Sequence, residues 1–363
     1  MALADAALET PIPVVDLDRV DANLARMAAY AASHGLALRP HVKTHKSAHV
    51  AALQVEHGAV GLTCATPREL EVMSGVADSL LWAFPPVGVR RVARLLAIDQ
   101  RVGLRVSLDS DEAIDGLAVA ARAAGRQVGV LVEVDLGMRR VGVATPAEAA
   151  RLALRVADSS PLRFEGIAFY PGHIRSDGPE ADASLGRVSD DLAEVLDALG
   201  AAGLAAPVVS GGSTPTAWRS HEIDGVTEIR PGTYVYNDRA TVASGVAGRE
   251  DCALTVLATV VSTAVPRQAV VDAGTKALGR EPRGGDDQFG FGEILDHPEV
   301  VVRAMSEEHG ILDLRRTDWT PRVGDQVQII PNHVCIVTHL FDAVAAVRGG
   351  RVVEGWQVAA RSR

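Results

Sequence analysis

The sequence has few cysteines, few aromatic residues and no long hydrophobic run. Among its 363 residues only Cys64, Cys252 and Cys335 are cysteines, and their spacing forms no pairs. An odd number without paired spacing argues against a disulfide framework and leaves each thiol available for packing or for a metal ion. The N-terminus lacks the basic and apolar regions of a signal peptide, and no stretch reaches ~18 consecutive apolar residues. We therefore expect a cytoplasmic protein.

Positive charge is also scarce. Lysine and arginine number 36 against 46 aspartates and glutamates, which gives a formal net charge of −10, and no run of basic residues offsets it. Such a surface repels phosphate backbones and anionic lipids, so neither nucleic acid nor membrane is an expected partner. Hydrophobic residues make up 47% of the chain and charged residues 23%. This composition supports a large buried core and argues against extensive disorder.

Short apolar runs alternate with helical patterns between residues 16 and 245, as is typical of βα units in a parallel sheet. The eight predicted strands are Leu36–Val42, Ala59–Ala65, Ser79–Phe84, Val102–Leu108, Val128–Val134, Phe164–Tyr170, Pro207–Ser210 and Thr227–Tyr234. Helices are predicted over Asp16–His34, with Asp16 as N-cap and Gly35 as its end, and over Asp111–Ala124 and Pro146–Ala157. Eight strands favour a closed (β/α)8 TIM-type barrel over an open sheet, which usually has fewer strands.

The pattern changes after residue 245 to apolar runs without long helices. The runs are Ala253–Val261, Gln268–Val271, Gln326–Ile330, His333–Thr338 and Ala343–Arg348. They predict a second, smaller antiparallel β-domain over residues 246–363, with residues 1–15 packed against it. The stretch Gly279–Pro298, rich in glycine, aspartate and proline, is expected to be a long surface excursion.

Polar groups gather directly after the first predicted strand, in the sequence Arg39-Pro-His-Val-Lys43-Thr-His-Lys46. In a parallel barrel the carboxyl ends of the strands face the active site. Lys43 could hold pyridoxal phosphate (PLP) there as a Schiff base if burial or a nearby cation lowered its pKa. A basic loop that simply lies in solvent explains the same residues equally well.

Other predicted strands also end in polar or glycine-rich segments. The fifth is followed by Arg140, the sixth ends in Tyr170-Pro-Gly-His173, the seventh in Ser210-Gly-Gly-Ser213, and the eighth contains Pro231-Gly-Thr-Tyr234. Glycines let backbone N–H groups approach a phosphate, and barrel phosphate sites lie preferentially after strands seven and eight. A glycine pair alone more often marks a turn, but two such loops at this corner favour a phosphate site.

In the predicted β-domain, His333 and Cys335 lie in one apolar run. Alternation along a strand would place both side chains on one face, about 7 Å apart, within reach of a single ion. Imidazole and thiolate suit zinc, but two ligands are too few for a structural zinc site. The pair therefore predicts either an open catalytic metal site or a packed cysteine beside a histidine.

Together these motifs resemble the D-serine dehydratase and D-threonine aldolase family of PLP enzymes, whose fold is the alanine-racemase-type barrel with a β-domain. The similar segments, in chain order, are Thr10-Pro11, Arg39–Lys46, Glu133–Gly137 with Arg140, Gly211–Ser213, Pro231–Tyr234, Asp272–Lys276, Glu307–Gly310 and Pro331–Cys335.

The resemblance implies a role for each of these residues. It makes Lys43 the Schiff-base lysine and the base at Cα, Arg140 a neighbour of the cofactor ring or its phenolate, and Tyr170 a neighbour of the pyridine nitrogen. The phosphate would be bound by Gly211, Gly212, Ser213, Gly232 and Thr233, with Tyr234 close by. His333 and Cys335 would hold a divalent metal, zinc or manganese, against the β-hydroxyl of the substrate, and His173 is the candidate base for that hydroxyl. The resemblance also implies that the protein is an obligate head-to-tail homodimer.

The resemblance also orders the possible activities on D-amino acid substrates. We favour retro-aldol cleavage of D-β-hydroxy amino acids to glycine and an aldehyde, because the segment from Tyr170 to His173 is similar to aldolase members. A D-serine-type dehydratase follows closely, because dehydratases of the family use histidine and cysteine on the metal, where aldolases more often have aspartate in place of the cysteine. An amino-acid racemase is third. A non-catalytic PLP carrier is disfavoured because such proteins normally need only the barrel.

Overall fold

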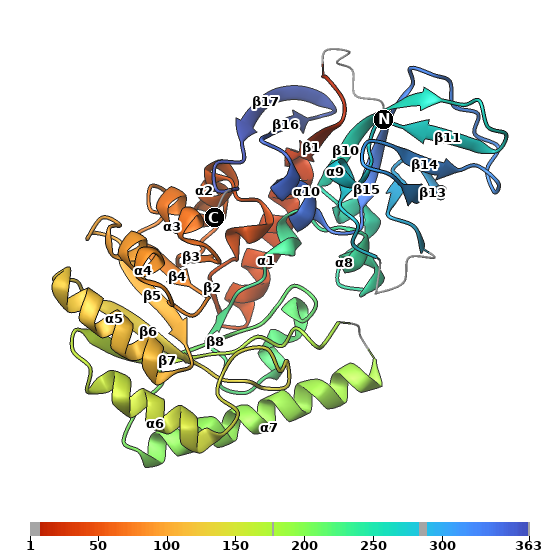
Figure 1. Cartoon of the computed structure of the whole chain (residues 1–363). Helices are drawn as coiled ribbons and strands as arrows, with labels where there is room; N and C mark the ends of the chain where they lie inside the picture. Colours follow the sequence, from red (N-terminus) through yellow and green to blue (C-terminus); the bar gives the residue numbers. More distant parts are fainter. Residues whose placement is uncertain (1–7, 176–177, 283–288, 362–363) are drawn as a thin grey trace. The chain divides into compact units, whose positions relative to one another are not determined.

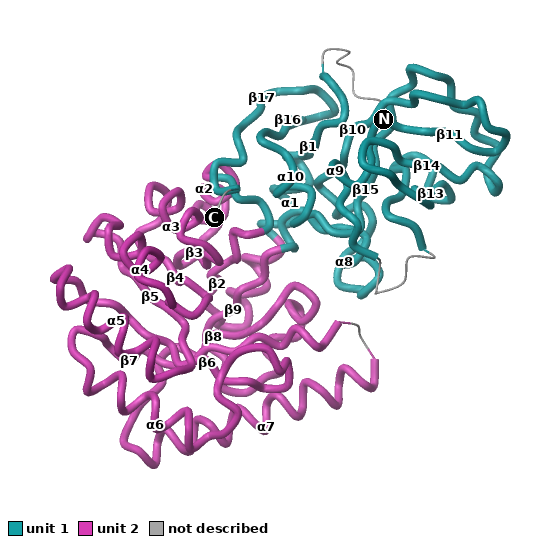
Figure 2. The backbone as a smooth tube through the Cα atoms, in the orientation of Figure 1, with its two compact units in different colours: residues 1–25, 44–47, 233–361 teal, residues 26–43, 48–232, 362–363 magenta. Residues whose placement is uncertain are grey.

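The computed structural model describes residues 8–175, 178–282 and 289–361, and the chain forms two compact units (Figure 2). Unit 1 contains residues 1–25, 44–47 and 233–361, and unit 2 contains residues 26–43, 48–232 and 362–363. This division at residue 232 differs from the expected boundary at residue 245. The short segment 44–47, directly after Lys43, belongs to unit 1.

Unit 2 contains an eight-stranded parallel β-barrel (Figure 1). Its strands are β2 (Ala37–Leu38), β3 (Leu62–Cys64), β4 (Ser79–Trp82), β5 (Gly103–Leu108), β6 (Val128–Glu133), β7 (Leu162–Ala168), β8 (Val208–Gly211) and β9 (Glu228–Ile229). They follow the order β2-β9-β8-β7-β6-β5-β4-β3 and pair in parallel. A bridge between His41 and Thr63, with Thr63 N donating to the Pro40 carbonyl at 2.9 Å, joins β2 to β3 and closes the barrel. Each of the eight predicted strands overlaps one of these.

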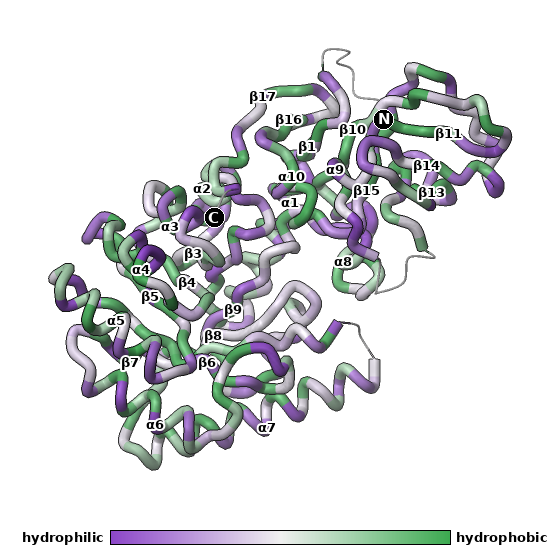
Figure 3. Tube along the Cα trace, in the orientation of Figure 1, coloured by the Kyte–Doolittle hydropathy of each residue, from purple (hydrophilic) through white to green (hydrophobic). Residues whose placement is uncertain are grey.

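The helices around the barrel bury one apolar face each, as their periodicity predicts. They are α1 (Leu17–Ser33), α2 (Ala48–Glu56), α3 (Pro67–Met73), α4 (Val89–Leu96), α5 (Asp111–Ala123), α6 (Pro146–Ala157) and α7 (Pro179–Ala201). Figure 3 shows apolar and polar residues alternating along α5, α6 and α7. The Asp16 carboxylate caps α1 by accepting from the N–H groups of Asp18 and Arg19, and Gly35 adopts φ +65° just after its end.

Unit 1 is built on a nine-stranded sheet in the order β11-β14-β13-β12-β15-β10-β1-β16-β17. Its strands are β1 (Ile12–Asp16), β10 (Leu254–Ser262), β11 (Gln268–Val271), β12 (Gly292–Ile294), β13 (His297–Met305), β14 (Gly310–Asp313), β15 (Gln326–Pro331), β16 (Ala343–Arg348) and β17 (Arg351–Gln357). All pairs are antiparallel except β1 with β16. Among the described residues after Thr233, this unit also contains the short α-helices α8 (Arg239–Ala243), α9 (Thr275–Leu278) and α10 (Val334–Leu340).

Four of the five strands predicted for this domain are confirmed, and β1, β12, β13, β14 and β17 were not predicted. The expected surface excursion Gly279–Pro298 is only partly irregular, because it contains β12 and the start of β13; its residues 283–288 lie outside the described part of the chain.

The predicted strand over His333–Thr338 is wrong. These residues form the start of helix α10 (Val334–Leu340), and His333 is its extended N-cap residue. The valines and isoleucine of this segment have high strand propensity. A buried carboxylate accepts from the first helical N–H group, however, so tertiary hydrogen bonding outweighs propensity here. Strand alternation therefore does not explain why His333 and Cys335 lie close together.

Within the described ranges no helix is both long and apolar enough to cross a membrane.

Candidate active site

Lys43 lies with Tyr170 and Arg140 in unit 2. It belongs to a 3-10 turn, Val42–Thr44, that follows β2, and its side chain is half-buried. The Lys43 Nζ atom is 5.9 Å from the centroid of the Tyr170 ring, and the Arg140 guanidinium carbon is 4.7 Å from the same centroid. Both distances are within cation–π range. The three side chains predicted to surround the cofactor ring are thus brought together by segments that follow β2, β6 and β7.

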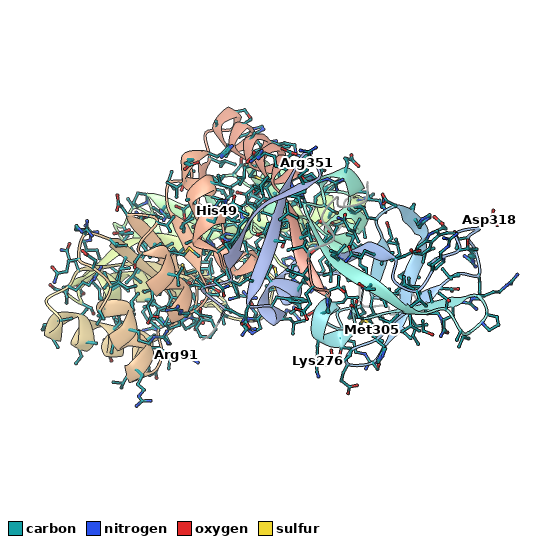
Figure 4. The ribbon with its side chains drawn as sticks, turned by 90° about the horizontal axis from the view of Figure 1, so that it is seen from above. His49, Arg91, Lys276, Met305, Asp318 and Arg351 are labelled. Carbon is teal, nitrogen blue, oxygen red and sulfur yellow. The ribbon has the colours of Figure 1, made fainter. Side chains whose placement is uncertain are left out.

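The sequence contains two lysines besides Lys43, at positions 46 and 276. Lys276 is 65% exposed and pairs with Glu308 at 2.6 Å, and Figure 4 shows it projecting away from the body of the structure. An exposed, paired ammonium is not activated for attack. Lys46 is buried, and its carbonyl accepts from Ala360 N.

A buried polar network inside the barrel fixes the strand ends that carry the site. Arg39 pairs with Glu228 at 2.7 Å, and Ser210 Oγ donates to the other Glu228 oxygen at 2.7 Å. The buried Arg230 donates to the carbonyl oxygens of Ser210 at 2.6 Å and of Phe169 at 2.9 Å. Phe169 precedes Tyr170, and Ser210 precedes Gly211, so these bonds hold the ends of β7 and β8 in a defined position.

The loop after β8 has the features of a phosphate-binding segment. Gly212 adopts φ +88°, and a Cβ on Gly211 would lie 2.2 Å from the Phe169 ring, so glycine is required at both positions. Ser213 N donates to the Thr216 hydroxyl at 3.2 Å, which folds the loop back on itself.

Gly232, after β9, joins this loop because its N–H donates to Thr214 Oγ1 at 3.2 Å. Glycines, hydroxyls and backbone N–H groups in one place fit a phosphate group. Gly211, Gly212, Ser213 and Gly232 therefore lie together as predicted. Thr233 and Tyr234, the next residues, begin a 3-10 turn in unit 1, where Tyr234 is buried.

His173 lies beyond the end of β7, on the segment that also carries Tyr170. Its ring packs on Gly137, where an added Cβ would be 3.0 Å from His173 Cε1. Burial lowers the pKa of His173 below its ordinary value of 6.5, and Asp135 opposes that effect. The imidazole is therefore mainly neutral at pH 7 and able to accept a proton.

In unit 1, His333 and Cys335 are neighbours at the start of α10. The Cys335 sulphur is the main cause that raises the pKa of His333, to about 11, against the opposing effect of burial; Asp238 adds to the increase. His333 Nδ1 lies 3.0 Å from an Asp238 oxygen, and Cys335 Sγ lies 3.3 Å from Thr44 Oγ1. A turn into a helix, rather than strand alternation, thus brings the two side chains together.

This pair fits a divalent ion that keeps open positions. Imidazole nitrogen and thiolate are ligands that zinc prefers. Within residues 8–175, 178–282 and 289–361, no group of three or more histidine, cysteine, aspartate or glutamate side chains is placed to hold a metal. An ion here would have two protein ligands, which leaves room for water or substrate.

Neither Asp238 nor Thr44 is recognisable from the sequence as part of this site. Asp238 is separated from His333 by 95 positions, and no spacing pattern connects them. Thr44 lies beside Lys43 in the sequence, but nothing in the sequence indicates that it contacts Cys335.

Comparisons with known proteins agree with this arrangement. Residues 15–240 match the alanine racemase N-terminal domain, and residues 253–347 match the "Putative serine dehydratase domain". The D-threo-3-hydroxyaspartate dehydratase of Delftia sp. (strain HT23) is 36% identical over 96% of this chain and 97% of its own length. The D-threonine aldolase of an Arthrobacter species is 31% identical over 98% of this chain and 93% of its own length.

Solved structures lead to the same group of enzymes. The D-threonine aldolase from Filomicrobium marinum matches with a TM-score of 0.90 and 33% identity, covering 98% of this chain and 96% of its own. The Delftia dehydratase matches with a TM-score of 0.89. Two further solved structures are variants of a D-threo-3-hydroxyaspartate dehydratase in which a histidine and, two positions later, a cysteine are replaced by alanine, and the cysteine variant is in the metal-free form.

The family match covers more than half of the chain, and full-length relatives exceed 30% identity. The chain therefore belongs to the D-serine dehydratase and D-threonine aldolase family of PLP-dependent lyases, which has the alanine-racemase-type fold.

Proposed function

We propose that this enzyme is a metal-dependent dehydratase of D-β-hydroxy amino acids that releases an α-keto acid and ammonia. This reverses the order of activities favoured by the sequence alone. The observation that carries the proposal is the cysteine at position 335 beside His333. The same histidine-to-cysteine spacing occurs in the D-threo-3-hydroxyaspartate dehydratase variants, of which the cysteine variant is metal-free.

PLP would be held by the residues of the barrel and the segment that follows β9. Lys43 would carry it, with Arg140 and Tyr170 beside its ring. Its phosphate would be bound by Gly211, Gly212, Ser213, Gly232 and Thr233, with Tyr234 nearby. When bound, PLP supplies an electron sink for the pair of electrons left at Cα.

A divalent ion, zinc in preference to manganese, would be held by His333 and Cys335. When bound, it supplies a Lewis acid that assists departure of the β-hydroxyl. Within unit 1, the hydroxyl of Thr44, the residue after Lys43 in the chain, contacts Cys335.

The remaining steps are assigned to side chains of this protein. The free Lys43 amine would take the proton from Cα, and the β-hydroxyl would leave as water. One water molecule is then consumed when the amino group is released as ammonia, so the net products are the keto acid and ammonia. Arg140 would keep the ring of Tyr170 in place through their 4.7 Å contact.

Retro-aldol cleavage is the second candidate because of His173. Its lowered pKa leaves it mainly neutral at pH 7, as a base for the β-hydroxyl proton must be. Loss of that proton would break the Cα–Cβ bond and give glycine and an aldehyde.

Product analysis separates these activities. The PLP-loaded enzyme would be given D-serine and D-threonine, with and without a chelator, and glycine, aldehyde, keto acid and ammonia would be measured. We expect keto acid and ammonia in equal amounts, lost on chelation and restored by zinc. Glycine and aldehyde as main products would favour the aldolase. Full turnover in enzyme shown by elemental analysis to hold no metal would contradict both and favour a racemase.

A further inference from the structure

The buried carboxylate of Asp238 makes contacts that a helix cap alone does not need. It is completely buried at the N-terminus of α8. Its Oδ1 atom accepts from Thr241 N at 2.9 Å, which is the ordinary capping bond. Its Oδ2 atom lies 3.0 Å from His333 Nδ1 and accepts from Val334 N at 3.1 Å.

These contacts fix both the ring and the backbone of His333. The bond from Val334 N holds the peptide directly after His333, and the bond from Nδ1 sets the rotation of the imidazole. A carboxylate can only accept, so Nδ1 must carry a proton. A metal ion can bind only when the proton on the other nitrogen is lost, and the lone pair is then on Nε2, the nitrogen on the far side from Asp238.

We propose that Asp238 is a positioning residue that holds His333 in the tautomer and orientation needed to bind a divalent metal through Nε2. The inference rests on the proposed function, since that function requires an ion at His333 and Cys335. Carboxylate partners of this kind commonly orient metal-binding histidines, and their loss weakens metal binding by roughly 10–100-fold.

Substitution by asparagine tests this role because the three groups that contact the Asp238 carboxylate are all donors. Three N–H groups, from Thr241, Val334 and the His333 ring, share two carboxylate oxygens. An amide has only one oxygen. If this amide oxygen faces Thr241, the amide NH2 group lies opposite two other donors, Val334 N and His333 Nδ1. If the oxygen faces His333, the cap of α8 is lost.

Serine provides a second variant that separates the two functions of the side chain. Its hydroxyl can cap α8 by accepting from Thr241 N, but it is too short to reach His333. The matched control is Thr241→Val. It removes the hydroxyl that accepts from Asp238 N at 2.8 Å, and so weakens the same helix end without altering the contact to His333.

The experiment measures zinc affinity of the PLP-loaded enzyme by competition with a chromophoric chelator. We expect Asp238→Asn and Asp238→Ser to bind zinc roughly 10–100-fold more weakly than wild type while keeping the PLP absorbance band. Thr241→Val should lower the unfolding temperature and leave zinc affinity unchanged. Excess zinc should restore activity to Asp238→Ser, but not to His333→Ala, which lacks the ligand itself.

The outcomes distinguish this inference from the function on which it rests. If wild type binds zinc and Asp238→Ser binds it equally well, Asp238 is only a helix cap and the inference is wrong, although the proposed function stands. If Thr241→Val loses as much affinity as Asp238→Ser, the effect is general loosening and the inference is again wrong. If wild type binds no zinc, both fail.

Discussion

Lys43 is the single side chain on which the proposed chemistry depends most. The Lys43→Ala variant should lose the visible absorbance of lysine-bound PLP, because only a positioned amine can form that bond. The exposed and paired Lys276 provides the control, and Lys276→Ala should keep the band. A band that survives in Lys43→Ala and disappears when Lys46 or Lys276 is also replaced would assign the cofactor to another lysine.

Cys335 should matter for the metal and not for PLP. The Cys335→Ala variant should keep the PLP spectrum, but its activity should fall by a factor of about ten or more. Chelation of the metal from the wild type should have the same effect. Cys335→Asp would be milder for an aldolase, because a carboxylate can replace thiolate as an anionic ligand and favours harder ions such as manganese. A dehydratase that relies on zinc should suffer more. The metal content of each Cys335 variant would be measured together with its activity. A variant that loses activity but keeps its metal would show a packing defect instead of the loss of a metal ligand.

His173 gives a prediction about pH. Burial lowers the pKa of His173 below 6.5. The neutral, basic form of this imidazole should therefore still predominate at pH 6.5 and be lost only at a lower pH. Any retro-aldol activity should therefore decline on the acid side of a pH profile at a pKa under 6.5, and His173→Gln should remove that decline together with most of the activity. Dehydration by the same samples should be affected much less. An unchanged aldol profile in His173→Gln would exclude this residue as the base.

For strands and helices, local patterns in the sequence were informative where a segment is buried continuously or along one regular face. All eight barrel strands could be predicted, because β-branched runs such as Val128–Glu133 are buried along their whole length. Helix α10 could not be predicted, since its start is determined by Asp238, a residue distant in sequence. The same distance hid Asp238 from the prediction of the site, whereas His333 and Cys335 were predicted as a pair from their ligand chemistry and from a strand alternation that the structure does not have.

The buried pair between β2 and β9 gives a prediction about stability. Glu228→Leu should destabilise the protein by about 3–5 kcal/mol, because it leaves the guanidinium of Arg39 buried without its partner. Urea unfolding followed by circular dichroism would measure the change. The exposed pair of Arg101 with Asp99 is a suitable comparison, and Arg101→Ala should have little effect on the same transition. Equal effects of the two substitutions would show that the buried network does not stabilise the barrel.

The prediction for the whole molecule concerns assembly. We expect the active species to be a homodimer, because the family resemblance implies one and symmetric dimers are the commonest oligomers. Sedimentation velocity of the PLP-loaded enzyme, with activity measured across the same concentrations, would test this. A species of one chain with full activity would contradict it. The formal net charge of −10 should help to keep larger aggregates from forming.

The division of the chain has a consequence for how such a gene can be recombined. Unit 1 is assembled from three separate stretches, and the middle one consists only of residues 44–47. Within this unit Thr44 contacts Cys335, and its carbonyl accepts from Thr338 at 2.7 Å. A single crossover near residue 232 would therefore pair the last stretch of one parent with the first two stretches of another. A functional chimera should need residues 1–25 and 44–47 from the same parent as residues 233–361, so shuffling of this family by single exchange events should be rare.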